Sequence, residues 1–471
     1  MATNLTVGPP TRSIVLFTIP LLIGNLFQQL YAFTDAAVVG RLIDVRALAA
    51  VGAAGGLQFL LIGFTFGAAG GLAIPVARAF GAGDFSLMRR FVAAGAVIAA
   101  AIAAVITAIG TFGAHTLLTL LNTPPDLIAN SEKFLAIAFA GTVVTMAYNY
   151  LASVIRALGD SRTPLIFLII ACVLNAGLVA LFIGVFHLGV AGASAATVLA
   201  QFVSVALCLI LIAKKIPQLR LRREDWHFQR KELGESARLG LTMGFQMSVI
   251  AVGSLILQYA INGLGSDAVA AFTAAIRVDQ TATAPLASFG LGMATFVAQN
   301  RGARHWKRIR IGVFRICLVV MAVSIILGAI IVFFGTPIAH MFVGDNEPEI
   351  TAMAHEYLII NGALYILLAI LFLLRNSIQG LGRTAVPTAA GVMELIFRAL
   401  AGLILVVHFG FLGACLAAPL AWIGALIPLG IAWIVERKTL IKTEAKDLAL
   451  KEDIARETGS HRFDPAAFES D

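Results

Sequence analysis

Long apolar runs that follow one another along the chain constrain its fold more than any other sequence feature. Each run is long enough to cross a bilayer as a helix, which takes about 20 apolar residues. The runs cover residues 13–40, 47–78, 90–121, 130–157, 164–187, 190–213, 237–264, 268–300, 311–335, 352–380, 384–408 and 412–435. Only 13% of the 471 residues are charged, whereas soluble domains are about 25% charged. Because the alternation typical of β-barrel strands is absent, the pattern predicts an all-α polytopic membrane protein with twelve transmembrane helices.

Basic residues gather in the loops that follow the even-numbered runs. The richest of these loops is the segment 214–238, whereas the loops after odd-numbered runs carry few cations and later an acidic cluster. Cytoplasmic loops of membrane proteins carry the excess of Lys and Arg. We therefore expect a multi-pass protein of the cell (inner) membrane with both termini in the cytoplasm. The same rule explains the net charge of +8 without nucleic acid as a partner.

Short segments recur in the second half of the chain at a nearly constant spacing. The matching pairs are Ala47 and Ala268, Gly81 and Gly302, Gly189 and Gly410, and Pro164 and Pro387. The first three pairs share one spacing, and the proline pair departs from it by only two positions. Six helices per half would insert in the same direction, which predicts two parallel repeats with a central cleft. The expected parts are an amino-terminal lobe 1–213, a basic cytoplasmic linker 214–236, a carboxy-terminal lobe 237–435 and a charged cytoplasmic tail 436–471.

The first apolar run contains a carboxylate, Asp35. Such a residue costs about 2.5–3.5 kcal/mol near the membrane centre on insertion scales, so it indicates a functional site by default. Gln28 and Tyr31 in the same run are candidates for substrate contact or gating. The alternative is that Asp35, six residues before Arg41, lies at the membrane interface and is only solvated or paired.

Further polar residues lie in the second half. Glu394 is deep in the eleventh run, and Arg398 follows four residues later, so the two share a helix face and can form an ion pair. This pair is either structural, or Glu394 is a gating or substrate-facing acid. Gln246, in the seventh run, is a further candidate for substrate contact or gating, and both it and Asp279, in the eighth run, are expected in or near the second-lobe interior. Asp279 shares no helix face with Arg277, two residues earlier, so it must find its partner elsewhere.

Glycines and a proline shape two of the expected helices. Gly63, Gly67 and Gly71 form a GxxxGxxxG ridge in the second run, which is suited to close helix packing. Pro20 in the first run removes one helical hydrogen bond and can bend that helix.

Several motifs together carry a family resemblance. The first half contains LYAFTDAAVVGRL, FGAGD, IRALGDSRTP and GVAGASAAT, and the second half contains FVAQNRGA and MELIFR. In their order and spacing these resemble the multidrug and toxic compound extrusion (MATE) family, within the larger group that also holds flippases of polysaccharide and lipid-linked precursors. The resemblance covers residues 13–435. It implies two six-helix lobes and export of cationic organic compounds by alternating access, driven by uptake of protons or sodium ions.

The resemblance also assigns candidate ion-coupling residues. Asp35 falls on the first-helix acid that binds the coupling cation, and Asn175 falls on the asparagine of an N-x-x-x-D pattern. The acid of that pattern is replaced by Val179, which favours protons over a sodium ion held at Asp35 and Asn175. Asn149 in the fourth run is a weaker candidate of the same kind.

The expected function is therefore secondary antiport of small organic, often cationic, compounds across the membrane. The expected partners are the substrate, the coupling cation and the lipid bilayer, with the protein working as a monomer and without a cofactor. The alternative is a flippase for a lipid-linked sugar, which would need a basic cavity although intramembrane arginines are sparse. We expect no enzyme activity: no GxxxxGK[ST] loop is present, and His355–Glu356 lacks the second histidine of a zinc protease.

Overall fold

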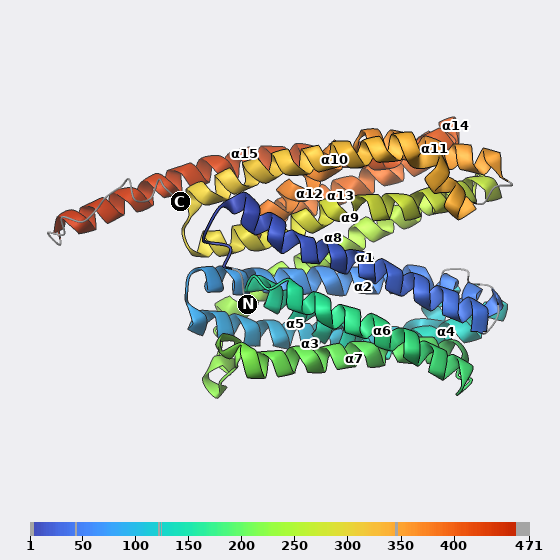
Figure 1. Cartoon of the computed structure of the whole chain (residues 1–471), viewed down its shortest axis with the longest axis horizontal. Helices are drawn as coiled ribbons and strands as arrows, with labels where there is room; N and C mark the ends of the chain where they lie inside the picture. The colour runs from blue at the N-terminus through green and yellow to red at the C-terminus, as the bar shows by residue number, and fades with distance from the viewer. Residues whose placement is uncertain (1–3, 43–44, 121–122, 124, 344–346, 458–471) are drawn as a thin grey trace. The chain divides into compact units, whose positions relative to one another are not determined.

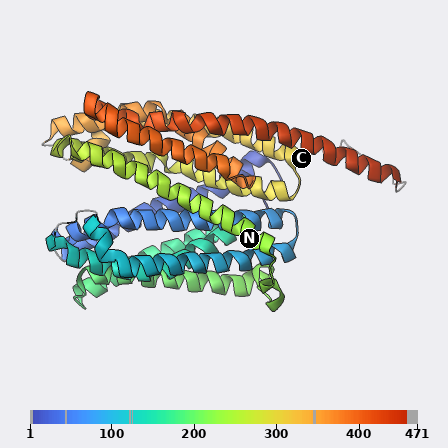
Figure 2. The same ribbon diagram turned by 180° about the vertical axis from the view of Figure 1, so that it is seen from behind.

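Helices make up nearly all of the described chain (Figures 1 and 2). The computed structural model describes residues 4–42, 45–120, 123, 125–343 and 347–457, and side chains within these ranges except 31–53, 120, 125–126, 341–343 and 454–457. Within these ranges no residue lies in a strand. Ten helices are long and apolar enough to cross a membrane, and two bent helix pairs bring the candidate spans to twelve. The predicted all-α membrane fold is therefore confirmed.

The helices follow the apolar runs of the sequence. In the first half they are α1 (Pro10–Leu42), α2 (Val45–Gly81), α3 (Phe85–Leu120), α4 (Pro125–Ala140), α5 (Thr142–Ala157), α6 (Arg162–Gly184) and α7 (Gly189–Lys215), followed by the short 3₁₀ helices η1 (Pro217–Leu219) and η2 (Arg223–Trp226). In the second half they are α8 (Arg230–Asn262), α9 (Ser266–Gly302), α10 (Trp306–Val343), α11 (Pro348–Ala363), α12 (Tyr365–Gly380), α13 (Ala385–Leu400), the π-helical η3 (Ala401–Leu405), α14 (Val406–Phe409) and α15 (Phe411–Glu457).

Several helices of the two halves match in length and in spacing. Helices α2 and α9 both have 37 residues, and their first residues have the same spacing as Ala47 and Ala268. Helices α4, α5, α11 and α12 all have 16 residues, and the second pair follows the first at the spacing of Pro164 and Pro387. The spacing found in short sequence segments thus extends to whole helices, which confirms the predicted repeat.

Two of the expected continuous spans are broken helices. The axes of α4 and α5 bend by 45° and those of α11 and α12 by 53°. At the first break a methyl group added to Gly141 would overlap Val198 of α7. At the second, the N–H of Leu364 donates to the Asn361 carbonyl at 3.0 Å, an i to i−3 bond that tightens the turn. Hydropathy alone does not locate such breaks, because both sides of each remain apolar.

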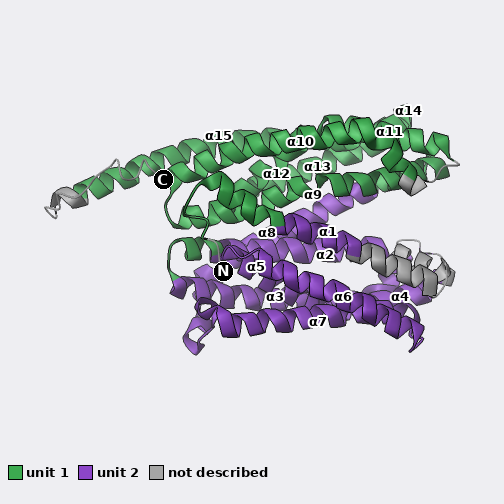
Figure 3. Ribbon diagram, in the orientation of Figure 1, with its two compact units in different colours: residues 1–19, 77–84, 256–471 green, residues 20–76, 85–255 purple. Residues whose placement is uncertain are grey.

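By internal contacts the chain forms two compact units (Figure 3). Unit 1 comprises Met1–Ile19, Ala77–Asp84 and Ile256–Asp471, and unit 2 comprises Pro20–Val76 and Phe85–Leu255. Within unit 2, α6 packs along α7, and α3 packs on α4 and α5. Within unit 1, α9 packs on α12, α10 on α11, and α13 on α15. Three helices, α1, α2 and α8, pass from one unit to the other.

The glycine ridge of α2 brings it into backbone contact with α8 inside unit 2. A methyl group added to Gly67 would lie 2.5 Å from the Met243 carbonyl oxygen, and one added to Gly71 would overlap the Leu239 carbonyl. The predicted close packing is therefore present at Gly67 and Gly71, whereas at Gly63 the nearest atom to an added methyl group is the Met247 Cβ at 3.8 Å.

A second glycine contact has repeat symmetry. Inside unit 1, a methyl group added to Gly81 of α2 would overlap the backbone of Gln299 in α9, and one added to Gly302 of α9 would overlap the backbone of Arg78 in α2. Gly81 and Gly302 occupy equivalent positions of the two repeats, and so do Arg78 and Gln299. The glycine position of each repeat therefore contacts the position of Arg78 or Gln299 in the other repeat, so the same pair of positions is in contact two times.

The residues before α1 are fixed against α9 and α10. Leu5 is fully buried, and its N–H donates to the Gln299 Oε1 at 3.0 Å. Its carbonyl accepts from Asn300 Nδ2 at 3.2 Å and from Arg308 Nη2 at 3.1 Å. This segment is therefore part of unit 1 rather than a loose end.

Residues 436–457 of the expected tail continue α15 as one helix. The side chains of Arg310 and Glu444 form an ion pair, and the indole of Trp306 donates to Asp447 at 2.9 Å. The beginning of α10 therefore holds the charged end of α15.

Candidate functional site

Asp35 and Tyr31 lie on α1 but outside the residues whose side chains are described. Their roles in ion coupling and gating stay predictions. Gln28, one to two turns earlier on the same helix, has an exposed side chain. An exposed amide within an apolar helix can face either a polar cavity or the membrane–water interface. The exposure of Gln28 therefore agrees with its candidate role but does not assign that role.

Asn175 is buried on α6 and faces α7. The hydroxyl of Thr197 on α7 lies 3.5 Å from the Asn175 Oδ1. One turn further along α6, Val179 is fully buried in an apolar cluster that includes Leu135 and Ile183. The position at which the family pattern often places an acid is therefore part of the apolar core.

Asn149 on α5 is buried as well. Its Nδ2 lies 3.5 Å from the Thr65 hydroxyl of α2, and one turn earlier the Thr145 hydroxyl donates to Gln201 of α7 at 2.6 Å. Each of the two asparagines thus has a hydroxyl partner on a different helix. Amide and hydroxyl oxygens can coordinate a hard cation, and they are also ordinary interhelical contacts in membranes.

Glu394 forms an ion pair with a residue of another helix, and its predicted pairing with Arg398 stays a prediction. The ion pair of Glu394 on α13 is with Arg375 of α12, and both side chains are buried. The i to i+4 spacing on α13 permits the pair with Arg398, but Arg375 reaches Glu394 from the neighbouring helix. Arg375 lies 19 residues before Glu394, a separation that no helical spacing connects.

Asp279 finds its partner on another helix, as expected. The hydroxyl of Tyr365 at the start of α12 donates to the Asp279 Oδ1 at 2.8 Å, and Tyr365 is fully buried. Arg398 is close enough to interact electrostatically both with Asp279 and with Arg375. Tyr365 was missed because a single tyrosine in an apolar run has no distinctive spacing.

Gln246 is almost fully buried on α8. By contacts this part of α8 belongs to unit 2, which also contains Asn149 and Asn175, rather than to unit 1 with Asp279 and Glu394. The candidate residues whose side chains are described therefore fall into two groups, a neutral polar group in unit 2 and a charged group in unit 1.

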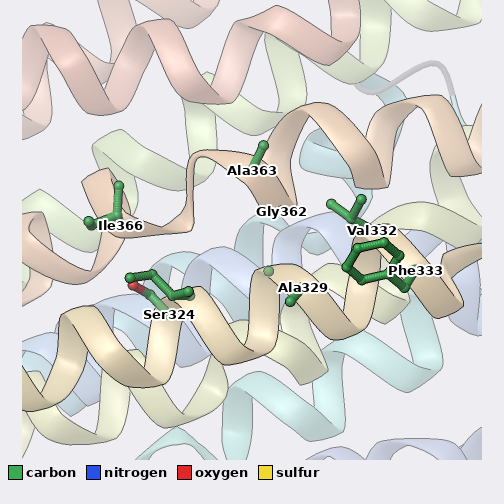
Figure 4. A pocket seen from close by; sticks show the side chains of 9 residues that line it. Ser324, Ala329, Val332, Phe333, Gly362, Ala363 and Ile366 are labelled. Carbon is green, nitrogen blue, oxygen red and sulfur yellow. The ribbon is translucent and has the colours of Figure 1, made fainter.

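An apolar hollow of about 300 Å³ lies at the break between α11 and α12 (Figure 4). Its walls come from α10 and from both sides of the break. The lining residues are Ser324, Ile325, Gly328, Ala329, Val332, Phe333, Gly362, Ala363 and Ile366. None of them is charged, so the hollow can accept an apolar group but cannot hold an ion by charge. Among the described side chains, no three His, Cys, Asp or Glu residues are grouped to bind a metal.

Comparisons with known proteins cover nearly the whole membrane region. The family model described as MatE matches residues 20–181 and 242–404, two stretches of nearly equal length whose offset agrees with the repeat. The probable multidrug resistance protein YpnP of Bacillus subtilis is 30% identical over 383 residues, covering 81% of this chain and 85% of YpnP. The probable multidrug resistance protein NorM of Thermotoga maritima is 24% identical over 385 residues, 80% of this chain and 81% of NorM.

Solved structures show the same fold. A crystal structure described as MATE in complex with MaL6 superposes with a TM-score of 0.86 at 19% identity and covers 94% of this chain and 99% of that one. At this identity the likeness concerns the helical architecture.

Proposed function

This chain belongs to the MATE family of multidrug-efflux transporters, and from this premise we propose that it is a secondary antiporter. It exports small organic, often cationic, compounds in exchange for protons or sodium ions. Two lobes, residues 1–213 and 237–435, alternate in opening to the two sides of the membrane. The protein works as a monomer in the cell (inner) membrane, with both termini in the cytoplasm.

The observation that carries this proposal is that the family model matches both halves of the chain. A transporter of two repeats has its substrate path at their interface, and a chain that lacked one half would lack one wall of that path. Relatives that cover most of this chain and most of their own length are named as multidrug resistance proteins, which supports organic compounds as the substrate class.

Asp35 is the residue to which we assign ion coupling. A carboxylate inside a membrane protein can bind a cation on one side and release it on the other as its surroundings change. Asn175 and Asn149 supply neutral oxygens in the same half of the chain. Because Val179 is buried in apolar core, it leaves the site with fewer oxygen ligands, and this favours protons over sodium ions.

The test is efflux of a fluorescent organic cation from proteoliposomes under a proton gradient and a sodium gradient imposed separately. We expect the proton gradient to drive efflux by the wild type, and Asp35→Asn to abolish the gradient-driven part. The matched control is Asp267→Asn, which removes an exposed acid near the start of α9 and should leave efflux unchanged.

Full gradient-driven efflux by Asp35→Asn would refute the assignment of Asp35. Efflux driven by sodium alone would refute proton coupling. If neither gradient moves the organic cation but a lipid-linked sugar crosses the membrane, the protein is a flippase and the antiport proposal is wrong.

A further inference from the structure

The segment between α7 and α8 presents an unusual concentration of positive charge. We call residues 214–231 the linker platform. All of its residues are described, and its exposed cations are Lys214, Lys215, Arg220, Arg222, Arg223, Arg230 and Lys231. Glu224 is the exposed carboxylate of the same segment. The outward surface of the platform therefore has a strong positive excess.

This excess arises because the neighbouring acids face inward. Asp225 of η2 is buried and pairs with Arg89 of α3 at 3.0 Å. Glu232, at the beginning of α8, is buried and pairs with Arg90 of α3 at 2.9 Å. The two carboxylates neutralise cations of α3 and leave those of the platform to the outside.

The same two acids also fix the backbone of the platform. Asp225 accepts a hydrogen bond from the Arg222 N–H at 2.7 Å, and Glu232 accepts one from the Gln229 N–H at 2.6 Å. Leu219 of η1, which lies in the sequence between α7 and these two acids, is also buried. The exposed cations are thus mounted on an anchored segment rather than on a loose loop.

The position of the platform places it at the surface of the bilayer. It begins at the last residues of one candidate span, Gly189–Lys215, and ends at the first residues of another, Arg230–Asn262. Trp226 in η2 is 49% exposed, and tryptophan is enriched where membrane proteins meet the headgroups. Cations and an aromatic ring at this level are arranged to contact lipid.

We propose that the linker platform binds the headgroups of anionic phospholipids in the leaflet at this end of the protein. Clusters of four to eight Lys and Arg next to a membrane span attract anionic lipid, and each cation near the surface contributes about a fivefold gain in affinity. The binding anchors the segment that joins the two repeats. This inference does not depend on which substrate or coupling ion the protein uses.

The charged end of α15 provides the contrast within the same chain. Among its described side chains from residue 436 on, the exposed cations are Arg437, Lys438, Lys442, Lys446 and Lys451, and the exposed acids are Glu452 and Asp453. Five cations and two acids leave an excess of three positive charges, whereas the seven cations and one acid of the platform leave six, so this helix should attract anionic lipid less than the platform does.

The experiment compares three full-length proteins purified in mild detergent. They are the wild type, the platform variant Arg220→Gln/Arg222→Gln/Arg223→Gln and the control variant Lys438→Gln/Lys442→Gln/Lys446→Gln. Both variants remove three exposed cations, so the change in total charge is matched. Native mass spectrometry then measures binding of phosphatidylglycerol and of phosphatidylcholine with the same acyl chains.

We expect the platform variant to bind phosphatidylglycerol at least tenfold more weakly than the wild type, and about 100-fold more weakly if the three cations act independently. The control variant should remain within twofold, and phosphatidylcholine should bind all three proteins equally. Added phosphatidylglycerol should raise the unfolding temperature of the wild type and the control but not of the platform variant.

Equal phosphatidylglycerol binding by the two variants would overturn the proposal. So would wild-type binding of phosphatidylcholine as tight as that of phosphatidylglycerol. Competition by soluble glycerol phosphate at the same concentration would show that the platform binds free phosphate rather than a lipid surface, and this too would refute the inference.

Discussion

Glu394 and Arg375 neutralise each other inside the second half of the chain. Removing two charges from water is costly, and a buried pair recovers that cost only when its geometry is good. Each side chain comes from a different helix, so the pair also joins α12 to α13. This arrangement favours the structural alternative for Glu394 over a gating acid.

Arg375→Ala should therefore be strongly destabilising, because it leaves the Glu394 carboxylate buried without its cation. We expect a loss of about 3–5 kcal/mol in the free energy of unfolding, measured by thermal unfolding in detergent. The double variant Arg375→Met/Glu394→Leu removes both charges at similar volume and should lose much less. A double variant as unstable as Arg375→Ala would show that packing rather than the stranded charge is responsible.

The burial of Leu5 near the amino terminus allows a second test of stability. Because it is fully buried, Leu5→Ala should cost about 2–5 kcal/mol, seen as a lower unfolding temperature. Val7, two residues later, is 64% exposed, and Val7→Ala should have no measurable effect. Equal effects of the two substitutions would mean that the segment does not dock as described.

At the scale of the helix, the α2 ridge allows a graded test. Gly71→Ala places a methyl group against the Leu239 backbone and should destabilise the protein by about 1–3 kcal/mol through overpacking. At Gly63 the nearest atom to an added methyl group is the Met247 Cβ at 3.8 Å, so Gly63→Ala should be neutral or slightly stabilising, since alanine favours helix. A stabilising Gly71→Ala would contradict the close α2–α8 contact.

The sequence predicted which helices exist but not how each is interrupted or paired. The lengths of the apolar runs predicted the membrane spans, and the GxxxG spacing predicted the face of α2 that packs on α8. At the break at Gly141 the close neighbour is Val198 of another helix, which no local pattern includes, and the break at Leu364 lies in an apolar stretch without a proline to mark it. The ion pair of Glu394 with Arg375 likewise depends on the approach of α12, which the spacing of residues along α13 does not include.

At the scale of the whole molecule, the repeat was the most informative prediction. A constant spacing between a few glycines and prolines anticipated equal lengths for α2 and α9 and for the broken helices. The polar residues did not follow the repeat: Asp35 corresponds to Ile256 by the spacing of the glycine pairs, and Glu394 corresponds to Ala171 by the spacing of the proline pair. The scaffold could therefore be predicted from symmetry, whereas the candidate sites had to be found one residue at a time.

The symmetry of the repeat also predicts that substitutions at equivalent positions destabilise the protein by equal amounts. Gly81→Ala and Gly302→Ala each place a methyl group against the backbone of the opposite helix, so both should lower the unfolding temperature by similar amounts. Gly177→Ala, where nothing lies within 4 Å of the added methyl group, is the matched control. A large effect of only one of the two substitutions would show that the contact is not reciprocal.

The reciprocal meeting of Gly81 and Gly302 has a historical consequence. A contact in which position A of one copy touches position B of the other, and the reverse, is the signature of a two-fold homodimer. An ancestral protein of half this length, with a single such glycine, could have paired with a second copy of itself at this point. Joining two copies into one polypeptide would preserve that interface, while freeing one copy to lose the acid that the other retained.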